Sequence, residues 1–149
     1  MMGVSLLPYK IVKPNQFCFV TITSRNSDKI TLALNTSEED YIVSSSYVTF
    51  EIIDTKLIDP QFLLLWFKRP EFDRYARFHS LGSARESFDY QNMEDVKIPL
   101  PPIEVQRSIV NIYRCAEEAK RIAEEADRLS REICPALMQH IIHEAETKE

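Results

Sequence analysis

The sequence predicts an α+β fold, in which a small mixed or antiparallel β globule with short helices precedes a long C-terminal helix of the coiled-coil type. Three observations predict this architecture. Residues 16–53 alternate apolar and polar side chains with the period of two that strands require. Residues 60–79 hold two short helical segments that each begin at a proline. From Ile103 onward, apolar residues recur every three or four positions instead.

The β part should contain several short strands joined by polar turns. Four strands are expected, within residues 16–23, 29–34, 41–44 and 47–53. In the last of them Val48 and Phe50 alternate with Thr49 and Glu51, which indicates one buried face and one wetter face. We therefore expect a small, mostly antiparallel sheet.

Two short helices should follow the strands and cover the sheet. Asp59 can cap the first helix and Pro60 can occupy its first turn, so that the helix covers residues 61–68. Pro70 restarts a helix that should run to Arg77 or His79. Gly82 stands where a C-terminal cap is expected.

The chain is expected to divide at the proline-rich residues 99–102, because the prolines of the segment IPLPP exclude a helix there. Residues 1–98 would form the globule and residues 103–149 the long helix. From Ile103 to Ile133 that helix would be about 46 Å long at about 1.5 Å per residue. Pro135 should kink or end it, because proline removes a backbone hydrogen bond and clashes with the preceding turn.

One stripe of the long helix consists of small and apolar residues at three- and four-residue spacing, and we call it the alanine seam. Its members are Ile109, Ile112, Ala116, Ala119, Ala123, Ala126, Ser130, Ile133 and Leu137. Alanines allow two helix backbones to approach closely, whereas charged residues fill the outer positions. The seam therefore predicts a helical partner, and the alternative is that the helix folds back on its own globule.

Positive charge is concentrated in residues 68–85, although the whole chain has a net charge of −5. Arg74 and Arg77 are three residues apart and share a helix face. Arginines arranged in this way can hold phosphates or reach guanine edges in DNA. The alternative is a solvated helix face that pairs with Glu71 and Asp73. Arg25 and Lys29, in the loop between two expected strands, form a second candidate of the same kind.

The sequence offers no catalytic or metal-binding constellation. Two glycines in 149 residues exclude a glycine-rich phosphate loop. Cys18, Cys115 and Cys134 are too widely spaced for a zinc or redox motif, and we interpret them as reduced and structural. His140 and His143 lack the further ligands that a metal needs.

The apolar segments are too short to cross a bilayer, and the N-terminus lacks the pattern of a signal peptide. Both features predict a cytoplasmic protein.

Three stretches resemble a known family. The segments YIVSSSYVTFEI, DPQFLLLWFKRPEFDRYA and LGSARESFDYQNMEDVKIPLPPIEVQRSIV are similar to the second part of a target-recognition domain in type I DNA specificity subunits. The most specific part is the IPLPP run, which leads through IEVQ into a long helix. The resemblance covers roughly residues 8–137 and follows the family's order of motifs.

The resemblance implies sequence-specific DNA recognition by a subunit without catalytic activity, which directs methyltransferase and restriction subunits. S-adenosylmethionine, ATP and Mg would then be cofactors of those partner subunits. The long helices of the family pair antiparallel and set the spacing between two globules. The turn Gly82–Arg85 matches a family motif placed near DNA, whereas Ser44 to Tyr47 matches a strand entry that we assign to folding. The complete expected DNA-binding set is Arg25, Lys29, Arg74, Arg77, Ser83 and Arg85.

The chain departs from the family pattern in two ways. It holds one recognition globule and one long helix where the family has two of each, and its globule is expected to lack the N-terminal part. The chain would therefore form a homodimer, or pair with another specificity half, through the long helix. The rival hypothesis is a degenerate or truncated fragment that acts as a helical protein-interaction module without DNA binding. The DNA target itself depends on loop geometry and does not follow from the sequence.

Overall fold

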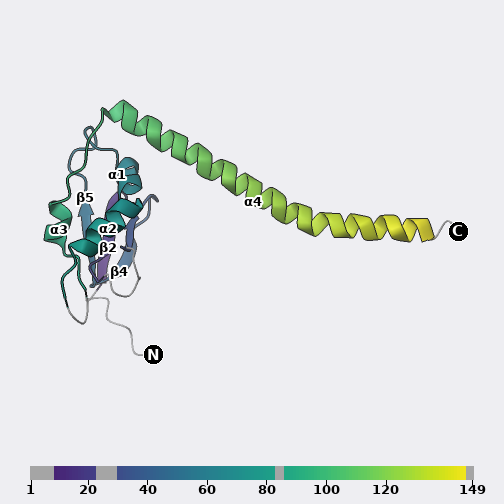
Figure 1. Ribbon diagram of the computed structural model, residues 1–149, viewed down its shortest axis with the longest axis horizontal. Helices are drawn as coiled ribbons and strands as arrows, with labels where there is room; N and C mark the ends of the chain where they lie inside the picture. Colours follow the sequence, from purple (N-terminus) through teal and green to yellow (C-terminus); the bar gives the residue numbers. More distant parts are fainter. Residues whose placement is uncertain (1–8, 23–29, 83–85, 147–149) are drawn as a thin grey trace. The chain divides into compact units, whose positions relative to one another are not determined.

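The computed structural model describes residues 9–22, 30–82 and 86–146. The chain divides into two compact units, Met1–Val110 and Asn111–Glu149. The first unit combines small antiparallel sheets with short helices, and the second consists of helix, so the predicted α+β class is confirmed (Figure 1).

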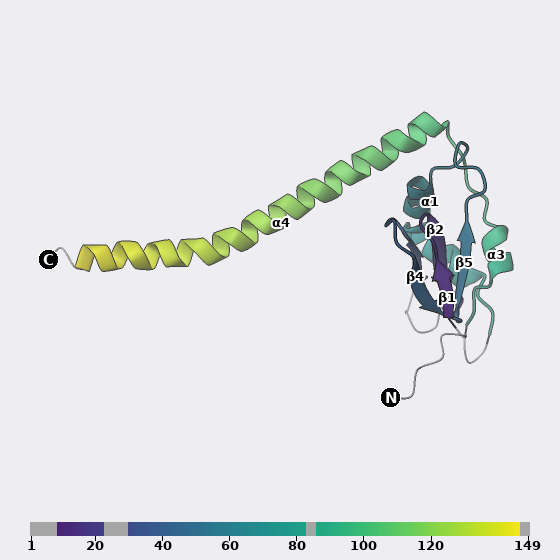
Figure 2. The same cartoon turned by 180° about the vertical axis from the view of Figure 1, so that it is seen from behind.

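The strands of the first unit form two antiparallel sheets. β2 (Gln16–Val20) is the centre of a three-stranded sheet, between β3 (Leu32–Leu34) and β5 (Tyr47–Glu51). β1 (Tyr9–Val12) pairs with β4 (Tyr41–Ser44) as a separate two-stranded sheet, seen from behind in Figure 2. The four predicted strands are therefore present, although those of the three-stranded sheet are shorter than expected.

β1 was not among the predicted strands. It is joined to β2 by a tight turn in which the amide of Gln16 donates to the carbonyl of Lys13 at 3.1 Å. Pro14 has the fixed φ that the second position of such a turn favours, and Asn15 has a positive φ of 62°. β1 was missed because the turn at Pro14 and Asn15 separates it from β2. Its four residues alone are too few to establish a period of two.

The helices cover one face of the three-stranded sheet. α1 (Pro60–Phe67) begins as predicted, because the Asp59 carboxylate accepts hydrogen bonds from the amides of Gln61 and Phe62 at 2.8 and 3.1 Å. α2 (Pro70–Phe78) also begins at its proline. Its C-cap is His79, whereas Gly82, with a φ of 134°, lies beyond the helix end, so the predicted glycine cap is wrong.

A third short helix, α3 (Tyr90–Glu94), was not predicted, because the stretch around it is polar and shows no helical period. Asp89 caps it by accepting a hydrogen bond from the amide of Asn92 at 2.9 Å. Five residues are too few to display a helical period, and only the buried Met93 anchors this helix to the core.

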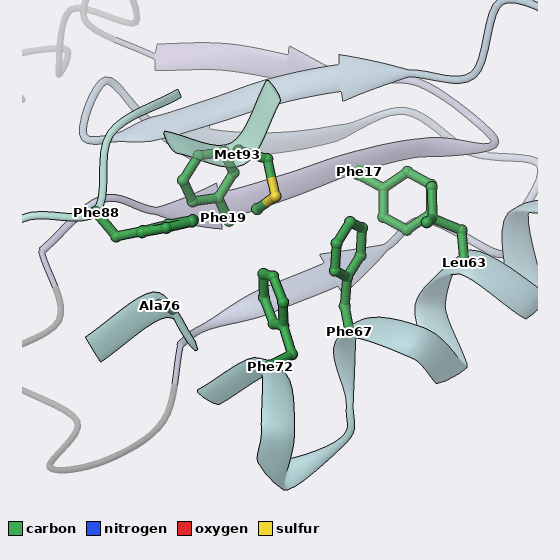
Figure 3. Packing of buried hydrophobic residues seen from close by; sticks show 8 residues of the cluster. All are labelled: Phe17, Phe19, Leu63, Phe67, Phe72, Ala76, Phe88 and Met93. Atoms are coloured by element: carbon green, nitrogen blue, oxygen red, sulfur yellow. The ribbon is translucent and has the colours of Figure 1, made fainter. Parts of the chain in front are cut away.

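The hydrophobic core lies between the three-stranded sheet and the helices. It consists mainly of aromatic side chains, which contact one another edge to face or at a tilt (Figure 3). Its buried members are Phe17, Phe19, Leu63, Phe67, Phe72, Ala76, Phe88 and Met93. Val48 and Phe50 pack against this cluster, which confirms the predicted inner face of β5.

The opposite face of β2 is covered as well. Cys18, between the two core phenylalanines of β2, is 9% exposed and lines a cavity of about 260 Å³ together with Val12 and Val43 from the β1–β4 sheet. Asn35 ties the same region together, because its side-chain amide donates to the carbonyls of Val12 and Glu39. β2 is therefore a central strand with both faces covered.

The long helix, α4 (Ile103–Glu146), continues through Pro135, so of the two predicted outcomes, a kink or a helix end, the helix end is wrong. Figure 1 shows that its ribbon curves in the C-terminal half. Its first two turns belong to the first unit, where Gln106 and Val110 are buried. From Asn111 to His143 every residue is exposed.

Candidate nucleic-acid interface

α2 places the two predicted arginines on its outer face. Phe72 and Ala76 are buried beneath the helix, whereas Arg74 and Arg77 are exposed. Sequence spacing predicted this arrangement, because residues three and four apart share a helix face. The buried residues fix the rotation of α2 about its axis, and this rotation places both arginines on the exposed side of the helix.

Arg74 also forms the ion pair that the alternative interpretation expected. Its guanidinium lies 3.4 Å from the Glu71 carboxylate, and the two side chains are 75% and 58% exposed. An ion pair so exposed contributes at most about 1 kcal/mol, so it offers little resistance to a competing phosphate. Asp73 plays a different part, because its carboxylate accepts a hydrogen bond from the amide of Ile30 at 3.2 Å.

The ends of two predicted DNA-binding loops lie close to α2. Ile30, which follows the loop with Arg25 and Lys29, is bonded to Asp73 of α2. Ile22, which precedes that loop, forms a bridge with Ser87, and Ser87 forms a second bridge with Leu81. Leu81 and Ser87 flank the second loop, so the fold brings the ends of both loops together beside one helix.

Four members of the expected DNA-binding set, Arg25, Lys29, Ser83 and Arg85, lie outside the described residues. Their contacts with DNA stay a prediction. The structure contributes the positions at which their loops leave and rejoin the fold.

Arg69 shows which basic residue of this segment serves the fold. Its guanidinium carbon lies 3.4 Å from the centre of a Trp66 ring, and its Nε donates to the carbonyl of Trp66 at 3.2 Å. This stacking is a cation–π contact. Arg69 is therefore committed to the connection between α1 and α2.

An apolar depression of about 490 Å³ lies elsewhere on the first unit, between β5 and the helices α1 and α3. Its wall includes Ile53, Leu57 and Met93, and its lining also carries the acidic residues Glu51, Asp54 and Glu94. Three carboxylates repel phosphate, so this side of the unit is a poor candidate for DNA.

α4 carries the second predicted surface. The isoleucines of the alanine seam are exposed, with Ile109 at 41%, Ile112 at 72% and Ile133 at 50%, and its alanines are exposed as well. The structure describes the seam as an open apolar stripe on one helix.

The apolar stripe is wider than the alanine seam that the sequence predicts. Ile122 and Leu129 are 56% and 40% exposed and lie one position before Ala123 and Ser130. With Cys115 and Ala136 they occupy the d positions of a heptad in which Ile112, Ala119, Ala126 and Ile133 are the a positions. The prediction followed the adjoining e row, and a strict count of seven would have found the d row.

The outer side of α4 is held by ion pairs between neighbouring turns. Arg121 contacts Glu118 at 2.6 Å, and Arg128 contacts both Glu125 and Glu132, at 2.6 and 2.9 Å. The hydrogen bonds from these arginines lower the pKa of the Glu118 and Glu125 carboxyls below their ordinary values. The charged residues therefore lie on the outer side of the helix, and the heptad face carries no charge.

The three cysteines are free, and they differ in burial. Cys18 is buried, and burial raises the pKa of its thiol, which disfavours the reactive thiolate. Cys115 and Cys134 are exposed on α4, so neither belongs to the buried core, and a structural role for them stays a prediction. Their exposure was not predictable from spacing alone, because the helix can hide or show any position depending on its partner.

Among the residues that the structure describes, no three His, Cys, Asp or Glu side chains gather in a way that could hold a metal ion. None of the described helices combines the length and the apolar character that crossing a membrane requires.

Comparison with known families gives one match over most of the chain. Residues 11–127 match the model of the type I restriction modification DNA specificity domain. A comparison with curated proteins found no match. The matched range begins within β1, includes the other strands and the short helices, and ends just past the middle of α4.

Proposed function

Because the chain belongs to the family of type I restriction modification DNA specificity domains, we propose that it contacts duplex DNA through the outer face of α2 and the two loops whose ends lie beside that helix. Membership in this family assigns the chain the DNA-specificity role of a type I restriction-modification system. That role is not catalytic. The cofactors of the system belong to its partner subunits, and we place S-adenosylmethionine, ATP and Mg there.

The observation that carries the proposed surface is that the described ends of both expected DNA-binding loops lie beside α2, which itself carries two exposed arginines. Arg74 and Arg77 project from the helix itself, and the loops with Arg25 and Arg85 leave the fold at Ile22 and at Gly82. A small protein with a net charge of −5 needs its positive groups gathered in one place to bind a polyanion. A single surface beside α2 meets that requirement.

The salt dependence of DNA binding tests this surface. Each phosphate contact that is removed should lower the slope of log K against log [salt] by roughly 0.9. We expect the double variant Arg74→Gln/Arg77→Gln to lose up to twice that amount, measured by fluorescence anisotropy on a duplex that the wild-type chain selects from a randomised pool. Arg121→Gln, which removes an exposed arginine from α4, is the matched control. An unchanged slope in the double variant would remove α2 from the interface.

We further propose that the heptad face of α4 pairs with a second helix of the same kind, either from another copy of this chain or from another specificity half. Two features of the heptad face support this proposal: its alanines would allow two helix backbones to approach closely, and its d row carries larger apolar residues. The pairing would bring two recognition globules into one complex and would add a docking surface for methyltransferase subunits.

The rival function is that of a helical interaction module without DNA affinity, and the acidic balance of the whole chain favours it. Selection of duplexes from a random pool distinguishes the two functions. Retention of duplexes from a random pool by the wild-type chain supports DNA recognition, whereas a chain that binds methyltransferase subunits but enriches no duplex supports the rival.

A further inference from the structure

Two large apolar side chains are exposed to solvent close to the arginines of α2 in the sequence. Phe78 is 84% exposed and Leu81 is 76% exposed. Phe78 is four residues after Arg74 and therefore shares the outer face of the helix. Leu81 lies just past the helix end, at the entrance to the loop that begins after Gly82.

Backbone and ring contacts hold both residues in place although their side chains are exposed. The amide of Leu81 donates to the carbonyl of Ser87 at 3.1 Å, and the amide of Ser87 donates back to the carbonyl of Leu81 at 3.0 Å. The ring of Phe78 contacts the ring of His79 edge to face, with centroids 5.2 Å apart. His79 in turn packs on Tyr75 at 4.2 Å.

From this arrangement we infer that Phe78 and Leu81 form an apolar wedge that enters between base pairs of the bound duplex. Proteins that deform DNA insert side chains such as Phe and Leu between base steps, and neighbouring cations hold the backbone on either side. Arg74 and Arg77 are placed to act as those cations. This inference rests on the proposed DNA-contacting surface.

The position of the wedge is what distinguishes it from other exposed apolar residues. Ile53 is fully exposed as well, but it lies in a depression whose lining carries Glu51, Asp54 and Glu94. Phosphates would be repelled there. Phe78 shares the outer face of α2 with Arg74, whose guanidinium pairs with Glu71. Leu81 forms a bridge with Ser87, which also bridges Ile22 before the first loop.

Wedge insertion and phosphate binding predict different behaviour, and this difference provides the test. A duplex selected by the wild-type chain is labelled with 2-aminopurine at successive positions, because the fluorescence of this base rises when it loses stacking. We expect Phe78→Ala to abolish that rise and to weaken binding by on the order of tenfold. Its salt slope should equal that of the wild type, because no phosphate contact is lost. Phe78→Leu, which keeps an apolar side chain, should retain most of both signals.

Ile53→Ala is the matched control, because it removes an exposed apolar side chain from the same unit at a site with acidic neighbours. Its affinity and fluorescence should match the wild type. If the wild-type chain binds duplex DNA while Phe78→Ala keeps its affinity and its 2-aminopurine signal, the wedge is wrong and the proposed surface stands. If the wild-type chain enriches no duplex at all, both proposals fail.

Discussion

At the scale of single residues, Gln106 is the clearest case of a polar side chain that organises the fold. It is fully buried, and its side chain bonds three backbone groups from separate segments. Its Oε1 accepts from the amide of Asp59, and its Nε2 donates to the carbonyls of Leu57 and Pro101, all between 2.8 and 2.9 Å. The first turns of α4, the start of α1 and the proline-rich segment therefore meet at one amide.

Gln106→Met should destabilise the first unit by about 3 kcal/mol. Methionine keeps the length and volume of the side chain but leaves buried amide and carbonyl groups without partners, at roughly 1–3 kcal/mol for each group. Urea unfolding followed by the fluorescence of Trp66, the single tryptophan of the chain, measures the loss. Gln139→Met, at an exposed position of α4, should leave the midpoint unchanged. A loss below about 0.5 kcal/mol for Gln106→Met would contradict this role.

Thiol labelling distinguishes the buried cysteine from the exposed ones. Because burial raises the pKa of Cys18, less of its thiol is ionised at a given pH, and its side chain is also shielded from reagents. At pH 8 we expect Cys134, which lies outside the heptad face of α4, to react with a maleimide at least about tenfold faster than Cys18. Peptide mapping should identify the slow residue as Cys18, and equal rates in the native state would refute its burial.

At the scale of secondary-structure elements, the ion pairs of α4 make the stability of this helix depend on pH. The pKa values of Glu118 and Glu125 lie below the ordinary 4.5, because arginines donate hydrogen bonds to their charged forms. A carboxyl whose pKa is lowered in the folded state stabilises the helix at pH values above its ordinary pKa. This contribution to stability is lost as the pH falls through the lowered pKa.

The thermal midpoint of the helix, followed by circular dichroism at 222 nm, should therefore fall between pH 6 and pH 3. The variant Glu118→Gln/Glu125→Gln should show a smaller fall, because its side chains no longer titrate. At pH 7, 1 M salt should weaken the same pairs in the wild-type chain by screening. A double variant with the full pH dependence of the wild type would assign the effect to other carboxylates.

Element types were predictable where local chemistry acts alone. The cap at Asp59, the prolines at residues 60 and 70 and the inner face of β5 all follow from rules that involve only neighbouring residues. α3 and β1 were not predictable, because each is short and depends on packing against segments distant in sequence. Gln106 was missed for the same reason, since a glutamine in a helix is normally solvated and only tertiary structure supplies its three partners.

The candidate site was predictable in part. Spacing placed Arg74 and Arg77 on one face, but it could not show that Arg69 is stacked on Trp66 or that two loops begin and end beside α2. The wedge residues gave no sequence signal, because Phe78 fits an apolar helical pattern equally well whether it is buried or exposed.

At the scale of the whole molecule, the proposed pairing of α4 makes the mass of the particle in solution the informative quantity. Ala123→Glu would put a charge at the middle of the alanine seam, where backbones must approach closely. We expect the wild-type chain to sediment as a dimer and this variant as a monomer. Arg121→Gln changes the net charge by the same amount on the outer side and should stay dimeric. A wild-type monomer would favour the alternative in which the seam is covered by its own globule.

The native Cys115 reports the direction of the pairing. If the heptad face between Ile112 and Ala136 is centred on residue 124, an antiparallel partner places its residue 133 opposite Cys115. In a Cys134→Ser background, Ile133→Cys should therefore give efficient disulfide-linked dimers, measured by non-reducing electrophoresis. Efficient linkage through Cys115 alone would indicate a parallel pair instead, because it requires Cys115 to face its own copy.

Pro135 divides the long helix in a way that bears on how such a complex is assembled. Proline has no amide hydrogen to offer the carbonyl of Arg131, so the helix lacks one backbone hydrogen bond at this point. The heptads before it can fix the register of two chains, while the turns after it, with Met138 and Ile141 exposed, can tilt to fit a differently shaped neighbour. One helix then combines a segment that fixes the pairing register with a terminal segment whose angle can adjust to a partner. A Pro135→Ala chain should lose this adjustment while it keeps the register.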